Sequence, residues 1–462
     1  MNLEKHPASF RDPCGFVFHR DGVLYRQVQA YGREGYDRLM GSGLYLALVS
    51  GNLLIPHEEV QTKPCGDSEE AYKILMPLQV PFLSYPYEWC FSQLRDAALL
   101  TLRIHALALR HGMILKDASA FNVQFLEGKP RLIDTLSFKT QDDQPWAAYG
   151  QFCRHFLAPL ALMAYGDARC HRMLGVHPDG IPLDLVAKLL PAWTRLKPGL
   201  GLHLHAHARF DRRYRKSRGA APPQKKSLGL KSMLGLADHL ESVVRGLSVR
   251  PSDTLWSHYE RLESYGSGAL AAKEHFVKEV LASFPRGVLW DLGANTGSYS
   301  EIAARLGFEV IALDEDVGAV EQNYLACKSR GEHSVLPIVA DLMVQSPAAG
   351  WENGERLSLL DRGPADAVLA LALVHHLAIG QNLPLERVAG FMKRCGRHLL
   401  IEFVPKEDPQ VKDMLFLRDF SFPRYTKGNF EAAFRPYFDI LSTVELPGSV
   451  RTLYSMRAKD AP

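Results

Sequence analysis

The residues with the most evident chemistry lie in the stretch VLWDLGANTGSYS, residues 288–300. An apolar run leads into Asp291, and small residues follow at Gly293, Asn295 and Gly297. A loop of this kind joins a strand to a helix, and its glycines let a nucleotide-like ligand approach the backbone. The acid precedes the first glycine, and the middle glycine of the dinucleotide motif is missing. The pattern therefore favours a ligand with an ammonium group over one with a pyrophosphate.

Two further acids end the next two strand-like runs. Asp314 follows VIAL, and Asp341 stands between VLPIVA and Leu342. The carboxyl ends of parallel strands meet at one edge of a sheet, so these acids should face one crevice. A carboxylate at Asp314 can accept both ribose hydroxyls, Asp341 can accept an adenine amino group, and Leu342 can pack on the ring. The set predicts S-adenosylmethionine as the cofactor, with helix capping as the alternative role of the two acids.

These motifs resemble those of the class I S-adenosylmethionine-dependent methyltransferases. The resemblance covers residues 255–458 and depends on DLGANTG, IALD, VAD and ALALVHHL. It implies an enzyme with a doubly wound, Rossmann-like α/β sheet of seven strands, with the cofactor across the strand tips and the methyl acceptor in the adjoining cleft. The stretch FDILSTVELPGSVRTLYSMR, residues 438–457, matches the antiparallel pair with which the family closes its sheet.

Three side chains are candidates for the acceptor side of the reaction. His375 and His376 directly follow the apolar run AVLALALV, and Glu402 lies in RHLLIEFV. A histidine titrates near neutral pH, so this pair could take a proton from a hydroxyl or orient a carboxylate. Alternatively, one histidine packs and the other is solvated. Glu402 in a buried strand needs a partner, and a salt bridge to Lys406 or Arg424 is the alternative to catalysis.

The residues after the fourth predicted strand bear on the methyl acceptor. The chain lacks the Asn/Asp-Pro-Pro-Tyr/Phe motif that methyltransferases acting on base amino groups often place after the fourth strand. We therefore expect a hydroxyl or carboxylate acceptor on a small molecule or a carrier-bound intermediate. RNA is the alternative acceptor, because basic residues gather at 209–226. A module that binds cofactor without turnover is disfavoured, since all the cofactor acids are present.

A second group of polar residues lies near GMILKDASAFNVQF. Asp117 precedes Asn122 in this stretch, and Asp134 follows in RLIDTLSF. This order resembles the protein-kinase-like fold, including small-molecule kinases. The resemblance covers roughly residues 14–200 and implies an α+β domain. In it Asp117 would accept a hydroxyl proton, while Asn122 and Asp134 would form a nucleotide and metal site.

The N-terminal pattern also departs from an active phosphotransferase. No Gly-rich loop is visible, and the position of an Asp-Phe-Gly motif reads Asp-Thr-Leu. The strand lysine is not identified, because Lys73 and Arg26 are both possible. We expect a degenerate kinase-like domain that aids recognition of a substrate or partner. An active phosphotransferase, which would make the chain bifunctional, is the alternative.

Length and composition fit a chain of several domains. The 462 residues suggest two or three domains at about 150 residues each. We predict a kinase-like domain over 1–202, a basic linker and connecting helix over 203–250, and a methyltransferase domain over 251–462. The run His203-x-His205-x-His207 falls in the predicted linker and is read as a solvated segment, so no metal site is predicted.

Charge and cysteine usage bear on partners and compartment. The net charge of +3 does not indicate a general polyanion binder, so nucleic acid is possible but not favoured. No apolar run reaches the roughly 18 residues of a membrane span, and the N-terminus has no signal-peptide core. Seven scattered cysteines without a C-x-x-C pair favour reduced thiols. We expect a cytoplasmic protein without a membrane partner, and its oligomeric state stays open.

Overall fold

The computed structural model describes the chain except at residues 1–2, 67–69, 143, 217–227, 250–266, 417–419 and 461–462. Two compact units make up the chain. The N-terminal unit comprises residues 1–250 and 349–356, and the C-terminal unit comprises 251–348 and 357–462. The predicted start of the methyltransferase domain at residue 251, and part of the basic stretch 209–226, lie outside the described residues. Within the described residues, no helix has the length and apolar character needed to cross a membrane.

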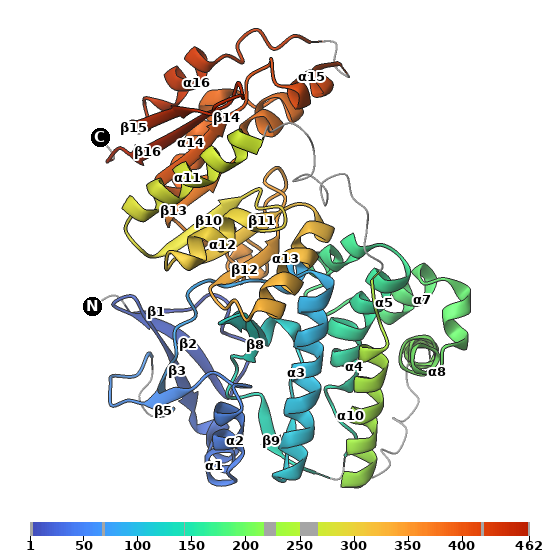
Figure 1. Ribbon diagram of the computed structural model, residues 1–462. Coiled ribbons are helices and arrows are strands. Elements are labelled where there is room, and N and C mark those ends of the chain that lie inside the picture. Colours follow the sequence, from blue (N-terminus) through green and yellow to red (C-terminus); the bar gives the residue numbers. More distant parts are fainter. Residues whose placement is uncertain are drawn as a thin grey trace. The chain divides into compact units, whose positions relative to one another are not determined.

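A seven-stranded sheet forms the centre of the C-terminal unit, yellow to red in Figure 1. Its order is β12-β11-β10-β13-β14-β16-β15. The first five are parallel, and β16 runs antiparallel to both β14 and β15. The strands are β10 (Val288–Leu292), β11 (Glu309–Asp314), β12 (Val335–Val339), β13 (Ala365–Ala370), β14 (Gly396–Phe403), β15 (Phe438–Glu445) and β16 (Thr452–Ala458). The predicted seven-stranded sheet with an antiparallel closing pair is confirmed.

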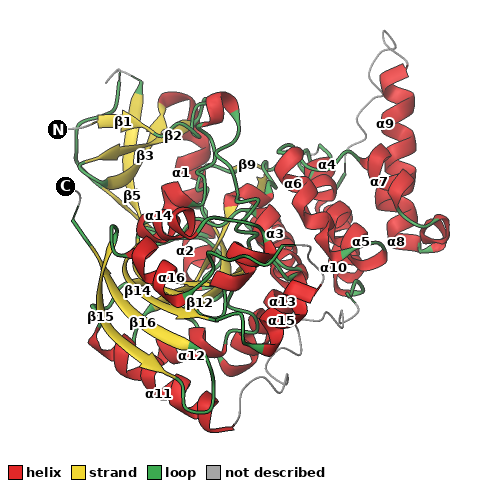
Figure 2. Ribbon diagram, turned by 90° about the horizontal axis from the view of Figure 1, so that it is seen from above, coloured by secondary structure: helices red, strands yellow, loops and turns green. Residues whose placement is uncertain are grey.

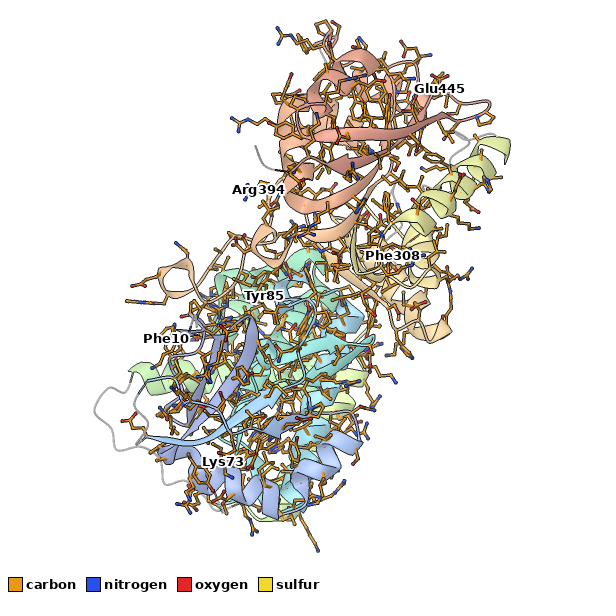
Figure 3. All side chains as sticks on the ribbon, turned by 90° about the vertical axis from the view of Figure 1, so that its left-hand side faces the viewer. Phe10, Lys73, Tyr85, Phe308, Arg394 and Glu445 are labelled. Carbon is orange, nitrogen blue, oxygen red and sulfur yellow. The ribbon has the colours of Figure 1, made fainter. Side chains whose placement is uncertain are left out.

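Helices alternate with these strands, as expected for crossovers between parallel neighbours. The described helices of this unit are α11 (Ser267–Ser283), α12 (Ser298–Arg305), α13 (Val317–Arg330), the 3-10 helix Leu360–Arg362 (η10), the π-helix His376–Gly380 (η11), α14 (Leu385–Cys395), α15 (Pro409–Phe416) and α16 (Lys427–Phe434). The strands are apolar almost throughout, because both faces of a parallel sheet are covered. One buried cluster joins Val277 of α11 to Leu289, Leu369 and Phe308, and Phe308 is labelled in Figure 3.

The N-terminal unit begins with a five-stranded antiparallel sheet, blue in Figure 1. Its order is β1-β2-β3-β5-β4. The strands are β1 (Leu3–Lys5), β2 (Gly15–Arg20), β3 (Val23–Gln29), β4 (His57–Glu59) and β5 (Ala71–Pro77). Asp21 and Gly22 both have positive φ in the two-residue turn between β2 and β3. This is the turn geometry that matches the twist of a hairpin.

The rest of the N-terminal unit is mainly helical (Figure 2). The long helix α3 (Phe91–Arg110) precedes two small antiparallel pairs, in which β6 (Met113–Leu115) joins β9 (Phe138–Thr140) and β7 (Val123–Leu126) joins β8 (Lys129–Leu132). The other α-helices are α1 (Arg33–Gly41), α2 (Leu44–Ser50), α4 (Tyr149–Phe152), α5 (Ala158–Tyr165), α6 (Met173–Val176), α7 (Leu183–Leu189), α8 (Pro198–Leu200), α9 (His207–Lys216) and α10 (Leu230–Arg245).

The expectation of a solvated segment around His203 and His205 is wrong. Both side chains are buried in the π-helix Gly201–Ala206 (η7). The ring nitrogens of His203 lie 2.7 Å from the Tyr149 hydroxyl and 2.9 Å from His239 Nδ1. His205 Nε2 lies 2.8 Å from the Thr194 hydroxyl, so both histidines have partners inside a helical layer that a basic and Gly-punctuated sequence did not indicate. Helix α10, also within the predicted linker and connecting helix, packs against α3.

Candidate active site

The glycine loop follows β10 at the carboxyl edge of the sheet. Gly293 and Gly297 have φ of 76° and 87°, in the left-handed region that favours glycine. A Cβ at Gly297 would come within 2.5 Å of the Asn323 side chain, so a larger residue would require the buried Asn323 to move. Gly297 is also the N-cap of α12. The loop thus presents backbone at the start of a helix, where partial positive charge collects.

Asp291 lies beneath this loop, in β10. Its side chain is buried, and the Ser300 hydroxyl donates to Asp291 Oδ2 at 2.6 Å. Burial, with a smaller contribution from Asp314, raises the pKa of Asp291 to about 6. Asp291 does not line the cavity described below. Its influence on that cavity is therefore indirect, through the position of the glycine loop and through its negative charge.

Asp314 ends β11 and holds the glycine loop from the neighbouring strand. The backbone N–H of Asn295 donates to Asp314 Oδ2 at 2.8 Å, and that of Asp316 donates to Oδ1 at 2.8 Å. Burial is the main cause that raises the pKa of Asp314 to about 6. The Asp314 side chain therefore holds the glycine loop through the backbone N–H of Asn295.

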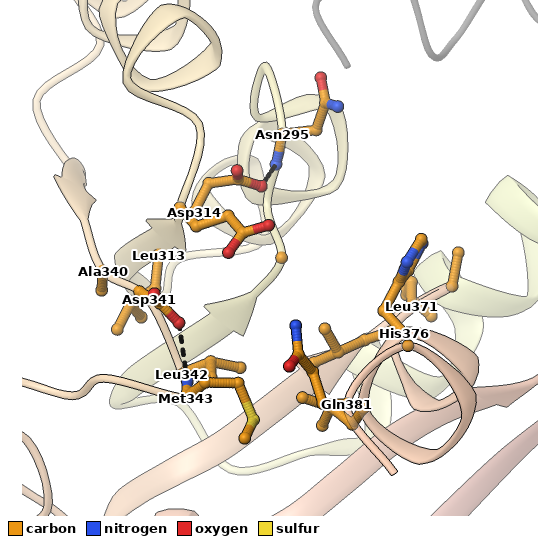
Figure 4. Close-up of a pocket in the computed structure, with 16 residues that line it drawn as sticks. Asn295, Leu313, Asp314, Ala340, Asp341, Leu342, Met343, Leu371, His376 and Gln381 are labelled. Atoms are coloured by element: carbon orange, nitrogen blue, oxygen red, sulfur yellow. Dashed lines mark hydrogen bonds between the residues drawn. The ribbon is translucent and has the colours of Figure 1, made fainter. Parts of the chain in front are cut away.

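A cavity of about 300 Å³ opens where the strands end, the usual place for a ligand in an open α/β sheet (Figure 4). Its walls contain Gly293, Asn295, Asp314, Asp341, Leu342 and His376 from the predicted set. Sequence reasoning missed the walls formed by Leu371, Met343 and Gln381. Asp341 Oδ1 accepts the N–H of Met343 at 2.8 Å, so this acid lines the cavity and also caps the following turn.

The predicted histidine pair follows β13, and its two members have different environments. His376 is half-buried and lines the cavity, whereas His375 is fully buried. Among the described residues, neither ring nitrogen of His375 has a hydrogen-bond partner. The near-neutral titration expected for this pair is wrong. Burial lowers the pKa of His376 to about 4 and that of His375 well below its ordinary value, so both rings are neutral at pH 7.

Glu402 is fully buried in β14, and its partners differ from those predicted. Lys273 of α11 donates to Glu402 Oε2 at 2.7 Å, and Arg451 Nη1 lies 3.7 Å from Oε1. Arg451 in turn donates to Asp408 through Nε at 2.6 Å. The predicted salt bridge to Lys406 or Arg424 is wrong, because α11 and the start of β16 bring these more distant cations to the strand.

The same glutamate contacts the wall of the cavity through the backbone. The N–H of Ala372 donates to Glu402 Oε2 at 2.8 Å, and Ala372 has a φ of 50°. A non-glycine residue in the left-handed region costs about 1–3 kcal/mol, and it keeps this conformation only where its surroundings hold it there. Glu402 itself does not line the cavity, so it is placed to position the loop that carries His376.

A second cavity, of about 810 Å³, shares this loop. The π-helix His376–Gly380 contributes His376 and Leu377 to the first cavity and Ala378 to the second. The second cavity is mostly apolar, and its walls include Phe420, Phe422, Tyr425 and Tyr437 together with Arg424.

The N-terminal candidate residues lie in two of the connections between the small paired strands. Asp117 follows β6, Asn122 precedes β7, and Asp134 lies between β8 and β9. Gln151 Nε2 donates to Asp117 Oδ1 at 2.7 Å. Burial raises the pKa of Asp117, and the nearby charge of Asp134 adds to this rise.

The strand cation next to Asp134 is an arginine. Arg26 of β3 forms an ion pair with Asp134, which also accepts hydrogen bonds from the Ser137 hydroxyl and the Leu136 N–H. Lys73 instead pairs with Glu59 at 2.6 Å in an exposed position (Figure 3). Among the described residues, no group of three His, Cys, Asp or Glu side chains is arranged to hold a metal ion.

The sheet order, the glycine loop and the acids at the strand tips define the methyltransferase fold class for the C-terminal unit. No family model matches the sequence. The chain is 33% identical over 464 aligned residues to "Nodulation protein NoeA" of Rhizobium meliloti (strain 1021), with 98% of this chain and 96% of that protein covered. The chain therefore belongs to the family of the nodulation protein NoeA.

Solved structures of lower similarity include two methyltransferases. Magnesium protoporphyrin IX methyltransferase (ChlM) from Synechocystis PCC 6803 with bound SAH is 17% identical, covering 45% of this chain and 95% of that chain, with a TM-score of 0.32. N-methyltransferase NodS from Bradyrhizobium japonicum WM9 is 10% identical, covering 42% and 98%, with a TM-score of 0.32.

Proposed function

We propose that the C-terminal unit binds S-adenosylmethionine and transfers its methyl group to an oxygen of a small-molecule or carrier-bound acceptor. The observation that carries this proposal is the cavity in which Asp314, Asp341 and the glycine loop meet at the ends of the strands. The residues fit the cofactor's chemistry. Asp314 is the acceptor for the two ribose hydroxyls, and Leu342 packs against the adenine ring.

The charges around the loop fit the methionine end of the cofactor. Gly293 and Gly297 give the loop its left-handed turns at the start of α12, where partial positive charge suits the cofactor's carboxylate, while Asp291 supplies negative charge for its ammonium. The cofactor, when bound, supplies a methyl group that its sulfonium already activates. The contribution of the chain is then to orient the acceptor and exclude water.

On the acceptor side, we assign His376 an orienting role. A neutral imidazole can accept a hydrogen bond from an acceptor hydroxyl, and its wall position puts it within the same cavity as the cofactor acids. The apolar cavity that shares the π-helix supports an acceptor with a nonpolar part. We assign Glu402 the task of holding Ala372, and hence this loop, in place.

Methyl-labelled cofactor tests the proposal directly. Cell extract incubated with the protein and the labelled cofactor is separated into RNA, protein and small-metabolite fractions and examined by mass spectrometry. Label in a small or carrier-bound metabolite, absent when Asp314→Ala replaces the native protein, is the expected result. Label that migrates with RNA and survives protease would instead establish the RNA methyltransferase alternative.

For the N-terminal unit we propose a degenerate kinase-like domain that serves recognition. The pairings β6–β9 and β7–β8 support the kinase-like layout, because Asp117 and Asn122 lie in the connection from β6 to β7 and Asp134 lies in the connection from β8 to β9. The ion pair between Arg26 and Asp134 opposes metal binding, since the carboxylate already has a cation beside it. An active phosphotransferase remains the alternative, and nucleotide binding distinguishes the two. All seven cysteines are free, which supports a reducing compartment such as the cytoplasm.

A further inference from the structure

A surface of the N-terminal unit combines exposed apolar side chains with unpaired cations. It is formed by α7, the 3-10 helix Ala192–Leu196 (η6), the π-helix η7 and α9, which pack against one another, and Figure 2 shows α7, α8 and α9 grouped together. Five large apolar side chains on these elements are 51–85% exposed: Leu189, Trp193, Leu196, Leu202 and Phe210. Six exposed cations accompany them: Lys188, Arg195, Lys197, Arg209, Arg212 and Arg213. We call these eleven residues the amphiphilic surface.

The charge of this surface is concentrated. Between Asp184 and Arg213 the chain has six Lys or Arg residues and two acids, a net charge of +4 with histidines neutral, whereas the whole chain has +3. One of the two acids, Asp211, lies 3.6 Å from His207. None of the six cations forms an ion pair with another described residue. Lys197 Nζ lies over the Tyr165 and Trp193 rings, 5.1 and 5.6 Å from their centroids, and the charges of the other five are available to an anionic partner.

Four of the cations converge on one hollow. A cavity of about 470 Å³ is lined by Lys188, Arg195, Arg209 and Arg212 together with His205, and no carboxylate of the described part of the chain lines it. Such a hollow suits a phosphate-containing group, which arginine binds through several donors. Trp193 directly follows Ala192, a residue of the cavity wall, and packs edge-on against Tyr165 with ring centroids 5.2 Å apart.

We propose that the amphiphilic surface binds the face of a bilayer that contains anionic phospholipids. Cations attract the headgroups, while exposed Trp, Leu and Phe side chains enter the interface. Nucleic acid also binds cations, and bases stack on aromatic rings. It offers no comparable site for Leu189, Leu196 and Leu202, so the apolar half of the surface favours lipid.

Vesicle flotation with the full chain tests this inference. The probes are vesicles of phosphatidylcholine alone and of phosphatidylcholine with ~30% phosphatidylglycerol, at about 0.1 M salt. We expect flotation with the anionic vesicles and little with the neutral ones. The double variant Arg195→Glu/Arg209→Glu should lower the partition coefficient at least about tenfold. Its matched control is Arg103→Glu/Arg110→Glu, two exposed charges on α3, which should leave flotation unchanged.

An apolar variant separates lipid from other polyanions. Leu196→Ser keeps every charge and should lower flotation several-fold, whereas Leu46→Ser, at another exposed leucine of this unit, should not. Circular dichroism shows whether each variant is folded. Equal flotation with both vesicle types, or none with either, overturns the inference. Binding to a single-stranded RNA homopolymer that is insensitive to Leu196→Ser, without flotation, would overturn it in favour of nucleic acid.

Discussion

Glu402 accepts the backbone N–H of Ala372 at 2.8 Å with the same oxygen that pairs with Lys273 at 2.7 Å. The buried Glu402 carboxylate thus contacts both Ala372, a strained residue in the cavity wall, and Lys273 of helix α11. Lys273, Glu402 and Arg451 are all buried, so removing one charge leaves the others in a low-dielectric environment. Such a change should mainly lower the free energy of unfolding, and its effect on the loop at Ala372 should be smaller.

The first prediction follows from this arrangement. Glu402→Gln keeps the shape of the side chain but removes the negative charge that pairs with Lys273. The free energy of unfolding should fall by about 3–5 kcal/mol, as measured by urea denaturation. Glu431→Gln is the matched control, because Glu431 is partly exposed and accepts a hydrogen bond from Tyr454 at 3.0 Å; it should cost about 1 kcal/mol or less.

A double variant shows whether the cost comes from the unpaired charge. Lys273→Met/Glu402→Gln should be more stable than the sum of the two single changes implies, with a coupling of about 0.5–3 kcal/mol. Strict additivity would mean that the pair does not interact and that Glu402 is buried for another reason.

The second prediction concerns cofactor affinity. Asp314→Ala removes the proposed acceptor for the ribose hydroxyls, so calorimetry with S-adenosylhomocysteine should show a loss of about 1.5–3 kcal/mol. Asp439→Ala, at an exposed acid on β15, should bind as the unaltered protein does. No binding by the unaltered protein, or equal binding by Asp314→Ala, would contradict the assignment.

The third prediction concerns pH. Burial raises the pKa of both Asp291 and Asp314 to about 6, so each binds its proton more tightly in the folded than in the unfolded chain. Their contribution to the unfolding free energy of the ligand-free protein is therefore largest at low pH and declines as pH rises from about 4 to about 6. Cofactor affinity should change in the opposite direction, because the ribose and the ammonium favour the ionised carboxylates.

A pH series of dissociation constants for S-adenosylhomocysteine checks this. Binding should tighten between pH 5 and pH 7 with a midpoint near pH 6 and then level off, and Asp314→Asn should flatten part of the profile. Affinity that does not vary with pH in the unaltered protein would mean that neither carboxyl titrates in this range.

The fourth prediction addresses the N-terminal unit. Because Arg26 already neutralises Asp134, a thermal-shift scan with ATP and Mg²⁺ should show no stabilisation at ligand concentrations well above a millimolar dissociation constant. Stabilisation that requires Mg²⁺ and disappears in Asp134→Asn would contradict the degenerate assignment. It would establish nucleotide binding, which the phosphotransferase alternative requires.

Local patterns explain which parts of the site could be predicted. Strand–helix alternation and the loop at Asp291–Gly297 are patterns among residues close together in the sequence. The first indicated the parallel sheet, and the second indicated the edge of the sheet at which the cavity lies. The partners of Glu402 could not be found this way, because Lys273 precedes it by 129 positions. The same limit applied to His203, whose partner His239 is brought close only by helix packing.

The titration of the histidine pair failed as a prediction for a similar reason. The sequence VHHL indicates two imidazoles beside a cleft, but the pKa of each depends on how much of the ring is buried. His375 is enclosed by the packed elements around it, while His376 faces the cavity. Adjacent residues of the same type therefore lie in different environments, and their roles should separate.

The last prediction tests that separation. His376→Ala should slow methyl transfer at saturating acceptor while leaving the dissociation constant for S-adenosylhomocysteine unchanged, because this ring faces the cavity but is not among the proposed cofactor ligands. His375→Leu should preserve activity and leave the unfolding free energy equal or higher, since an apolar side chain replaces a buried ring whose two nitrogens have no hydrogen-bond partner among the described residues. Turnover and urea denaturation measured on both variants decide the outcome. Loss of turnover in His375→Leu with an unchanged fold would assign the buried ring a part in the reaction. Weakened cofactor binding in both variants would make the pair structural.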